Sequence, residues 1–168
     1  MVAVVVMGVC GCGKSTIAKA IARELAGTFI EGDGLHPKAN VDKMASGIPL
    51  CDEDRWPWLT KIGETLSEEA SKGVAIAACS ALKKSYRDRI KAAAGREVLF
   101  VFLQGDKALI KSRMSKREGH YMPTSLIDSQ FAILEDPSDE SGVLAISIDD
   151  SPEKVASKAL VWLVDKNE

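Results

Sequence analysis

A chain of 168 residues, 46% of them hydrophobic, is long enough to bury one core without disulfides or metal ions, and we expect a single domain over residues 1–168. Its formal net charge of −2 excludes the basic excess of proteins that bind nucleic acid or anionic membranes, so any anion-binding site must be local. The apolar run at residues 2–7 is too short for a membrane span and lacks the basic residues of a signal peptide. We therefore expect a soluble, cytoplasmic protein; an organelle reached with a transit peptide that has since been removed is the open alternative.

Short apolar stretches rich in β-branched residues alternate with helical patterns along the whole chain. Strands are expected at 2–7, 28–30, 74–79, 98–103 and 143–148, and helices at 14–25, 37–44, 56–71, 83–94, 107–116, 124–134 and 152–164. Apolar strands separated by helices are typical of a parallel sheet that is covered on both faces. The sequence therefore predicts an α/β fold, in which ligands bind at the carboxyl ends of the strands.

The turn after the first strand has the composition of a phosphate-binding loop. The stretch GVCGCGKS, residues 8–15, fits G-x-x-x-x-G-K-[ST] between an expected strand and an expected helix. Such a loop aims backbone N–H groups at phosphate oxygens, and the next helix adds its positive N-terminal end. Lys14 is expected to reach the β- and γ-phosphates of a nucleoside triphosphate, and the Ser15 hydroxyl to ligate Mg²⁺. The nucleotide-binding residues predicted here are Gly8, Val9, Cys10, Gly11, Cys12, Gly13, Lys14, Ser15 and Thr16.

Two of the four cysteines, Cys10 and Cys12, lie inside this loop. The four form no C-x-x-C pair and have no histidine at zinc spacing, so we interpret them as reduced thiols. In the loop their backbone N–H groups matter more than their side chains, and we expect small filler residues. A thiol that is acidified by Lys14 and by the helix N-terminus, and is therefore sensitive to oxidation, is the open alternative.

Two carboxylates follow the second expected strand. A phosphate loop alone does not distinguish kinases from GTPases or motors, but the guanine-reading N-K-x-D is absent and the third strand ends in Ala-Ala-Cys79 without an acidic residue. In FIEGDGLHP, Glu31 and Asp33 come just past the strand end, where the γ-phosphate is expected. We assign Glu31 to the metal and Asp33 to the acceptor hydroxyl, whose proton it accepts or orients. His36 in the same turn is a candidate to donate to the acceptor, with a plain turn residue as the alternative.

Cationic side chains at two further places favour an acidic, hydroxylated acceptor. Arg55 follows an acidic triplet at 52–54, which we interpret mainly as helix capping, and its forked guanidinium is a candidate clamp for a carboxylate. Lys83 and Arg87 come after the third strand and share one face at helical spacing. All three are predicted to bind the acceptor.

A lid is expected around residues 114–124. Arg113 and Arg117 stand one helical turn apart before a loop that contains glycine and proline. Closing such cations over the phosphates stabilises charge in the transition state and excludes water. Gln130, on the helix that returns from this loop, is a candidate to reach the same cavity.

Together these motifs resemble the gluconokinase family of small P-loop kinases, which transfer the γ-phosphate of ATP to the 6-hydroxyl of D-gluconate. The resemblance rests on MGVCGCGKST, GDGLHP, KMASGIPLCDEDRWPWL, CSALKKSYRD and SQFAILEDP, in the order that the family shows. It implies a three-layer α/β/α fold like that of nucleoside monophosphate kinases, with a five-stranded parallel sheet, and often a homodimer. The cofactors it implies are ATP and Mg²⁺. The product of the implied reaction, 6-phosphogluconate, feeds the pentose phosphate pathway.

The resemblance also implies roles for single residues. It puts ATP on residues 8–16, Asp33 beside the acceptor hydroxyl, and Arg113 and Arg117 in the lid on the nucleotide side. The acid-x-acid turn of the related shikimate kinases supports pairing Glu31 with magnesium. Cys10 and Cys12 depart from the serine or alanine commoner in such kinases. The predicted catalytic residues are Lys14, Asp33 and Arg117, and the predicted gluconate contacts are Asp33, His36, Arg55, Lys83, Arg87 and Gln130.

Two alternatives stay open at the level of sequence. One is a kinase for another small hydroxy acid such as shikimate or glycerate, although shikimate kinases lack the GDGLHP and CSALKK pair. The other is a nucleotide-binding regulatory protein that has kept the phosphate loop and lost phosphoryl transfer.

Overall fold

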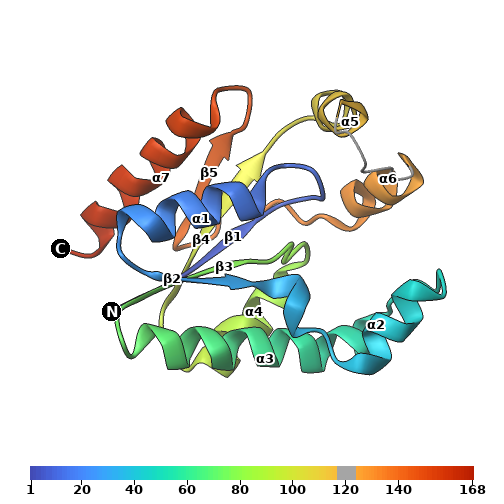
Figure 1. The fold of residues 1–168 in the computed structure, drawn as a ribbon, viewed down its shortest axis with the longest axis horizontal. Helices are drawn as coiled ribbons and strands as arrows, with labels where there is room; N and C mark the ends of the chain where they lie inside the picture. The colour runs from blue at the N-terminus through green and yellow to red at the C-terminus, as the bar shows by residue number, and fades with distance from the viewer. Residues whose placement is uncertain (117–123) are drawn as a thin grey trace.

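The strands of the protein are β1 (Val2–Met7), β2 (Thr28–Glu31), β3 (Val74–Ala78), β4 (Val98–Gln104) and β5 (Val143–Ser147). The computed structural model, which describes residues 1–116 and 124–168, joins them in one sheet in the order β2-β3-β1-β4-β5 (Figure 1). Every neighbouring pair is parallel. All five carboxyl ends therefore lie at one edge of the sheet, and the loops that follow them meet there.

Helices cover both faces of this sheet. They are α1 (Lys14–Glu24), α2 (Lys38–Ala45), α3 (Asp52–Ala70), α4 (Lys84–Ala94), α5 (Lys107–Ser115), α6 (Thr124–Ile133) and α7 (Pro152–Lys166). In Figure 1, α1 and α7 lie on one face and α3 and α4 on the other, while α5 and α6 stand at the carboxyl edge. The predicted three-layer α/β/α fold with a five-stranded parallel sheet is confirmed.

The alternation of side chains along β1 builds a separate core on each face. Val4 and Val6 pack with Ile21 of α1 on one side. Val5 and Met7 pack with Leu59 of α3 on the other side, and all of these side chains are buried. Because successive residues of a strand point to opposite faces, a fully apolar strand is what a sheet covered by two helical layers requires.

The predicted boundaries agree with the structure to within two residues, with one exception. The third helix was expected to begin at Trp56 but begins at Asp52, four residues earlier. The Asp54 carboxylate accepts the backbone N–H of Cys51 (3.0 Å), which caps a first turn N-terminal to Pro57. The short 3-10 helix η1 (Gly32–Leu35), which directly follows β2, was not predicted.

Two further sequence predictions concern membrane spans and the lid. None of the described helices is long and apolar enough to cross a membrane. Of the lid expected at 114–124 the structure describes only the two ends, and Arg117 lies outside the described residues.

Candidate active site

The loop between β1 and α1 has the tight geometry that its glycines predict. Gly8 adopts φ 144° and Gly11 φ 83°, a region that favours glycine. A Cβ at Gly8 would come within 2.9 Å of the Leu103 carbonyl oxygen, and one at Gly11 within 2.5 Å of the Met114 sulfur. Lys14 at the start of α1 donates to the Val9 carbonyl (3.1 Å), so its ammonium lies over the loop. The loop thus has the backbone shape of a phosphate cradle.

Gln130 of α6 contacts this loop directly. Its side-chain Oε1 accepts the backbone N–H of Cys10 at 2.5 Å, across 120 residues of sequence. The sequence predicted Gln130 as a contact of the acceptor, whereas the structure places its carboxamide against the phosphate loop. The helix that follows the expected lid is therefore tied to the loop that would hold the nucleotide.

The end of β2 brings a carboxylate to the start of α1. Ser15 Oγ donates to Glu31 Oε2 (2.7 Å), so the two residues predicted for the metal lie together. A hydroxyl and a carboxylate oxygen are hard ligands of the kind that Mg²⁺ prefers, and Mg²⁺ usually completes its shell with water and substrate phosphates. The pair fits a magnesium site built in that way.

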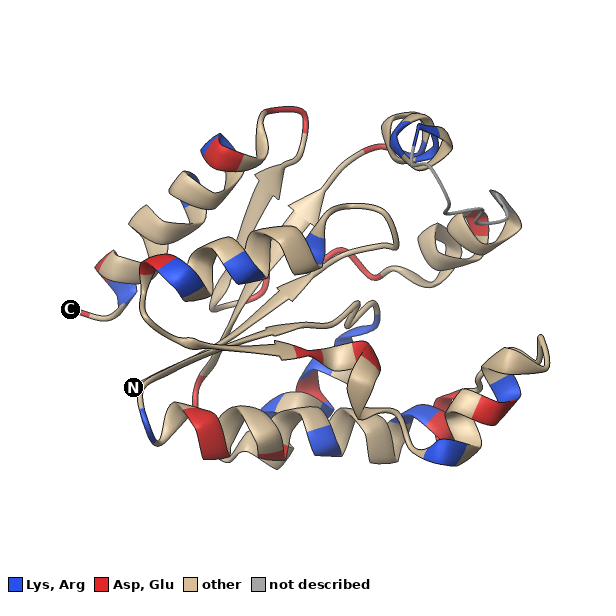
Figure 2. Cartoon of the chain, viewed as in Figure 1, with Lys and Arg blue, Asp and Glu red and all other residues tan. Residues whose placement is uncertain are grey.

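Asp33 lies on η1, in the acidic turn that appears in red after β2 in Figure 2. Three contacts fix the backbone of this turn. The Trp58 indole N–H donates to the Gly32 carbonyl (2.8 Å), and the Trp58 ring stacks on His36 (centroids 4.1 Å apart). A Cβ at Gly32 would lie 2.3 Å from the Ala78 carbonyl oxygen, so glycine lets the turn pack against β3. The side chain of Asp33 itself is exposed at the carboxyl edge of the sheet.

His36 follows this turn and lies near both Asp33 and Arg55. Its ring nitrogen Nδ1 is 3.2 Å from the Asn40 side-chain nitrogen. Burial lowers the pKa of His36, with the negative charge of Asp33 raising it and the positive charge of Arg55 lowering it. Both charges therefore act on the same imidazole, so Asp33 and Arg55 both lie near His36.

Arg55 and Lys83 meet around one carboxylate, that of Asp52. Lys83 Nζ donates to both Asp52 oxygens (3.1 and 3.3 Å), and Arg55 Nη1 lies 3.6 Å from Asp52 Oδ1. Tyr86 of α4 donates its hydroxyl to Asp52 Oδ1 (2.5 Å) and accepts from Arg55 (2.9 Å). The bonds from Tyr86 and Lys83 hold the pKa of Asp52 below its usual range, and the bond to Asp52 raises the pKa of Lys83. We call these four residues the Asp52 cluster.

Arg87 does not join this cluster. Its side chain is fully buried and donates to both Glu140 oxygens (2.6 and 3.2 Å), and also to the carbonyls of Ala81 (2.7 Å), Leu82 (3.1 Å) and Glu135 (3.0 Å). The N–H groups of the Arg87 guanidinium are therefore bonded to other protein atoms and do not face the acceptor. The prediction that Arg87 contacts the acceptor is corrected: Arg87 supports the loop before α4 that carries Lys83.

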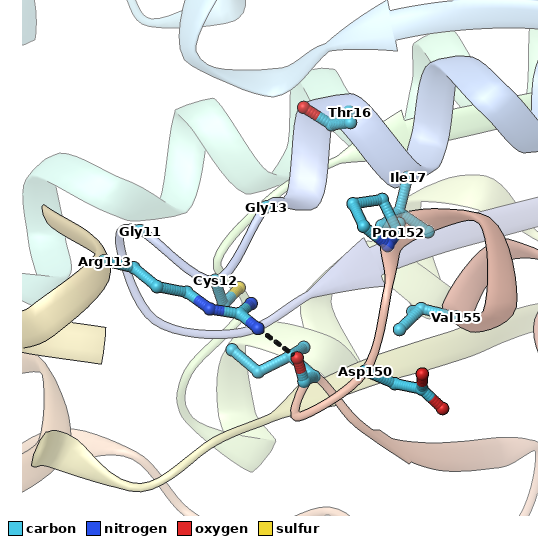
Figure 3. A pocket seen from close by; sticks show the side chains of 10 residues that line it. Gly11, Cys12, Gly13, Thr16, Ile17, Arg113, Asp150, Pro152 and Val155 are labelled. Carbon is cyan, nitrogen blue, oxygen red and sulfur yellow. Dashed lines mark hydrogen bonds between the residues drawn. The ribbon is translucent and has the colours of Figure 1, made fainter. Parts of the chain in front are cut away.

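A pocket opens beside the phosphate loop, between the start of α1 and the start of α7. Arg113 of α5 lies at its edge, where its guanidinium donates to the Ile148 carbonyl (2.5 Å; dashed line in Figure 3). Figure 3 also shows Ile17 and Val155 as apolar lining and Asp150 beside them. Arg113 thus lies beside the phosphate loop, and its predicted contact with the nucleotide stays a prediction.

Three residues of this region were missed by sequence reasoning. Asp52 was interpreted mainly as helix capping, and neither Trp58 nor Tyr86 was assigned a role at the site. The available signals were local: Asp52 precedes Arg55 by three residues on one helix, and Tyr86 follows Lys83 by three. Neither spacing shows that the two helices meet.

Comparisons with known proteins agree on one group of relatives. A family model described as "AAA domain" matches residues 4–137. The thermoresistant gluconokinase of Escherichia coli (strain K12) is 40% identical over 158 residues, which cover 93% of this chain and 90% of that protein. The gluconokinase of Gluconobacter oxydans is 43% identical over 157 residues, which cover 93% and 88%.

Solved structures give the same result. The crystal structure of a gluconokinase from Sinorhizobium meliloti 1021 superposes with a TM-score of 0.89 at 44% identity, over 98% of this chain and 92% of that one. The APS kinase of Mycobacterium tuberculosis matches with a TM-score of 0.72 over 96% and 97% of the two chains. At 18% identity that second likeness shows the fold alone.

Proposed function

The chain belongs to the gluconokinase family of P-loop kinases, and on this premise we propose that it transfers the γ-phosphate of ATP to the 6-hydroxyl of D-gluconate, which gives 6-phospho-D-gluconate. The observation that carries this function is the identity of about 40% to named gluconokinases over nearly the whole of both chains. A shikimate kinase matches only in fold, at 16% identity, so that alternative is not favoured. The alternative of a regulatory protein without kinase activity is not favoured either, because the relatives are named as kinases.

The sheet edge supports one arrangement of the two substrates. We place the triphosphate on the loop at residues 8–16 and the adenine in the pocket beside Arg113, near residues 149–151. Asp33 then faces the γ-phosphate from the end of β2 and takes the proton of the attacking hydroxyl. Lys14 and the two lid arginines, Arg113 and Arg117, stabilise the charge that develops on the transferred group.

The opposite end of gluconate carries the carboxylate, which we place at the Asp52 cluster. Arg55 and Lys83 supply the positive charge there, and His36 is close enough to Arg55 and Asp33 to feel both charges. Gln130 lies at the phosphate loop, where it can orient the γ-phosphate end of the nucleotide. Mg²⁺, when bound with ATP, would be held by Ser15 and Glu31 and would neutralise charge on the β- and γ-phosphates.

The test is ADP release from MgATP with gluconate, glycerate, shikimate or no acceptor. We expect strong release with gluconate alone. Release with another acid and none with gluconate would show that the substrate is wrong. ATP binding without release on any acceptor would show that the transfer function itself is wrong.

We also propose a homodimer, formed through a hollow between β5 and α7. The hollow has Trp162 and Leu144 in its lining, and Val161 beside them is 73% exposed. Lys158 and Asp165 of α7 flank Val161, so two α7 helices packed antiparallel would bring Lys158 of each opposite Asp165 of the other. Light scattering should give twice the chain mass for the wild type and a monomer for Val161→Asp. A wild-type monomer at micromolar concentration would rule the dimer out.

The cytoplasmic location expected from the sequence stays a prediction. Fractionation of cells that express the full-length protein tests it, and recovery in an organelle would contradict it.

A further inference from the structure

The Asp52 cluster has an unbalanced charge. Arg55 and Lys83 are both cationic, and among residues 1–116 and 124–168 the only carboxylate bonded to them is Asp52. Asp54, two residues further on, is engaged by Lys43 (2.9 Å), so that neighbouring pair adds no net charge. The cluster therefore carries one net positive charge.

The cluster is also open to a ligand. The side chains of Asp52, Lys83 and Arg55 are 36%, 30% and 24% exposed, whereas Tyr86 beneath them is buried. A contact whose only purpose was to fasten α3 to α4 would need one cation for one carboxylate. Here two cations share one carboxylate at the carboxyl edge of the sheet, next to the turn that holds Asp33.

We propose that Asp52 is a specificity-determining residue that makes the acceptor site select an end group with a single negative charge. The proposal rests on the proposed function, because it takes the carboxylate of gluconate as the anion that the cluster receives. One incoming carboxylate balances the remaining positive charge. A group with two charges leaves its second charge uncompensated and close to the Asp52 carboxylate, which repels it.

The geometry gives Asp52 a second part in the same selection. Its two oxygens hold the Lys83 ammonium, and through Tyr86 they orient the Arg55 guanidinium. Tyr86 contributes a hydroxyl but no charge. Charge and orientation can therefore be separated experimentally, by removing the charge of Asp52 in one variant and the hydroxyl of Tyr86 in another.

The probes are three six-carbon acceptors with the same hydroxyl configuration at C2 to C5 and a primary hydroxyl at C6. D-Glucitol is neutral at C1, D-gluconate has one negative charge there, and D-glucitol 1-phosphate has two at pH 8, well above the second pKa of a phosphate monoester of about 6. The measured quantity is the ratio of kcat/KM for the phosphate to kcat/KM for gluconate, with saturating MgATP.

We expect the wild type to use the phosphate at least about tenfold less well than gluconate, and Asp52→Asn to raise the ratio by about tenfold or more. Tyr86→Phe keeps all charges and should leave the ratio within about threefold of the wild type, whatever happens to its KM. Asp52→Glu should likewise keep the preference for gluconate. Thermal melting shows whether each variant is folded.

Three outcomes overturn the proposal. Equal losses on both acceptors in Asp52→Asn would leave Asp52 as a residue that only positions Arg55 and Lys83. Wild-type turnover of the phosphate as good as that of gluconate overturns it even if Asp52→Asn does not fold. A shift of the ratio in Tyr86→Phe as large as in Asp52→Asn would assign the selection to geometry. Absence of any wild-type turnover of gluconate is a different result, because it removes the proposed function itself.

Discussion

Asp33→Asn is expected to lower kcat for gluconate by about a thousandfold, since positioned general bases contribute roughly 10²- to 10⁴-fold. Asparagine keeps the size of the side chain but cannot take the hydroxyl proton at neutral pH. The turn itself should persist, because the Trp58 indole and the close packing of Gly32 against Ala78 hold its backbone and neither uses the Asp33 side chain. The affinity for MgATP should therefore change by no more than about threefold, because its binding site on residues 8–16 is intact. Coupled-enzyme kinetics and nucleotide titration measure the two effects separately.

The matched control is Asp42→Asn on α2. Asp42 is also an exposed aspartate, and its partner is Lys38 at 3.0 Å on the same helix. Its substitution should leave kcat unchanged. An Asp33→Asn enzyme with nearly full kcat would show that another group, or water alone, receives the proton, and a parallel loss of ATP binding would show that Asp33 acts through the nucleotide.

The sheet and the phosphate loop were predictable because both signals are local. Each buried strand is a short apolar run, and the loop pattern extends over eight consecutive residues between a strand and a helix. The two carboxylates at the end of β2 were found for the same reason, because the carboxyl ends of parallel strands meet at one edge. Glu31 and Ser15 do meet there.

The contacts around the acceptor were not predictable, because they join distant segments. Asp52 and Tyr86 are 34 residues apart, and Gln130 and Cys10 are 120 apart. Helical spacing also misled the interpretation of Lys83 and Arg87 as neighbours on one face. Lys83 is the N-cap of α4, with an extended backbone (φ −97°, ψ 149°), so the rule for residues four apart within a helix does not apply to it.

Arg87→Met is expected to cost about 3–5 kcal/mol of unfolding free energy, a large share of the ~5–15 kcal/mol typical of a domain. The guanidinium is fully buried, and its loss leaves the Glu140 carboxylate and three backbone carbonyls without their donor. Ala81, one of these carbonyl residues, has a positive φ of 46°, which an alanine adopts only when its surroundings hold it. Urea unfolding followed by circular dichroism should show a lower midpoint with an unchanged slope.

A control on the same helix separates burial from the mere loss of an ion pair. Lys84 and Asp88 form a 2.7 Å ion pair with side chains 61% and 50% exposed, so Lys84→Met should barely move the midpoint.

Because Arg87 fixes the loop before α4, Arg87→Met should also raise the KM for gluconate through Lys83, while the KM for ATP stays near that of the wild type. Equal midpoints for Arg87→Met and the wild type would mean that Glu140 and the loop carbonyls find water in place of the guanidinium, and that the loop does not need the arginine. Adding Glu140→Gln to Arg87→Met should recover part of the loss, because the carboxylate left without its partner is then removed as well.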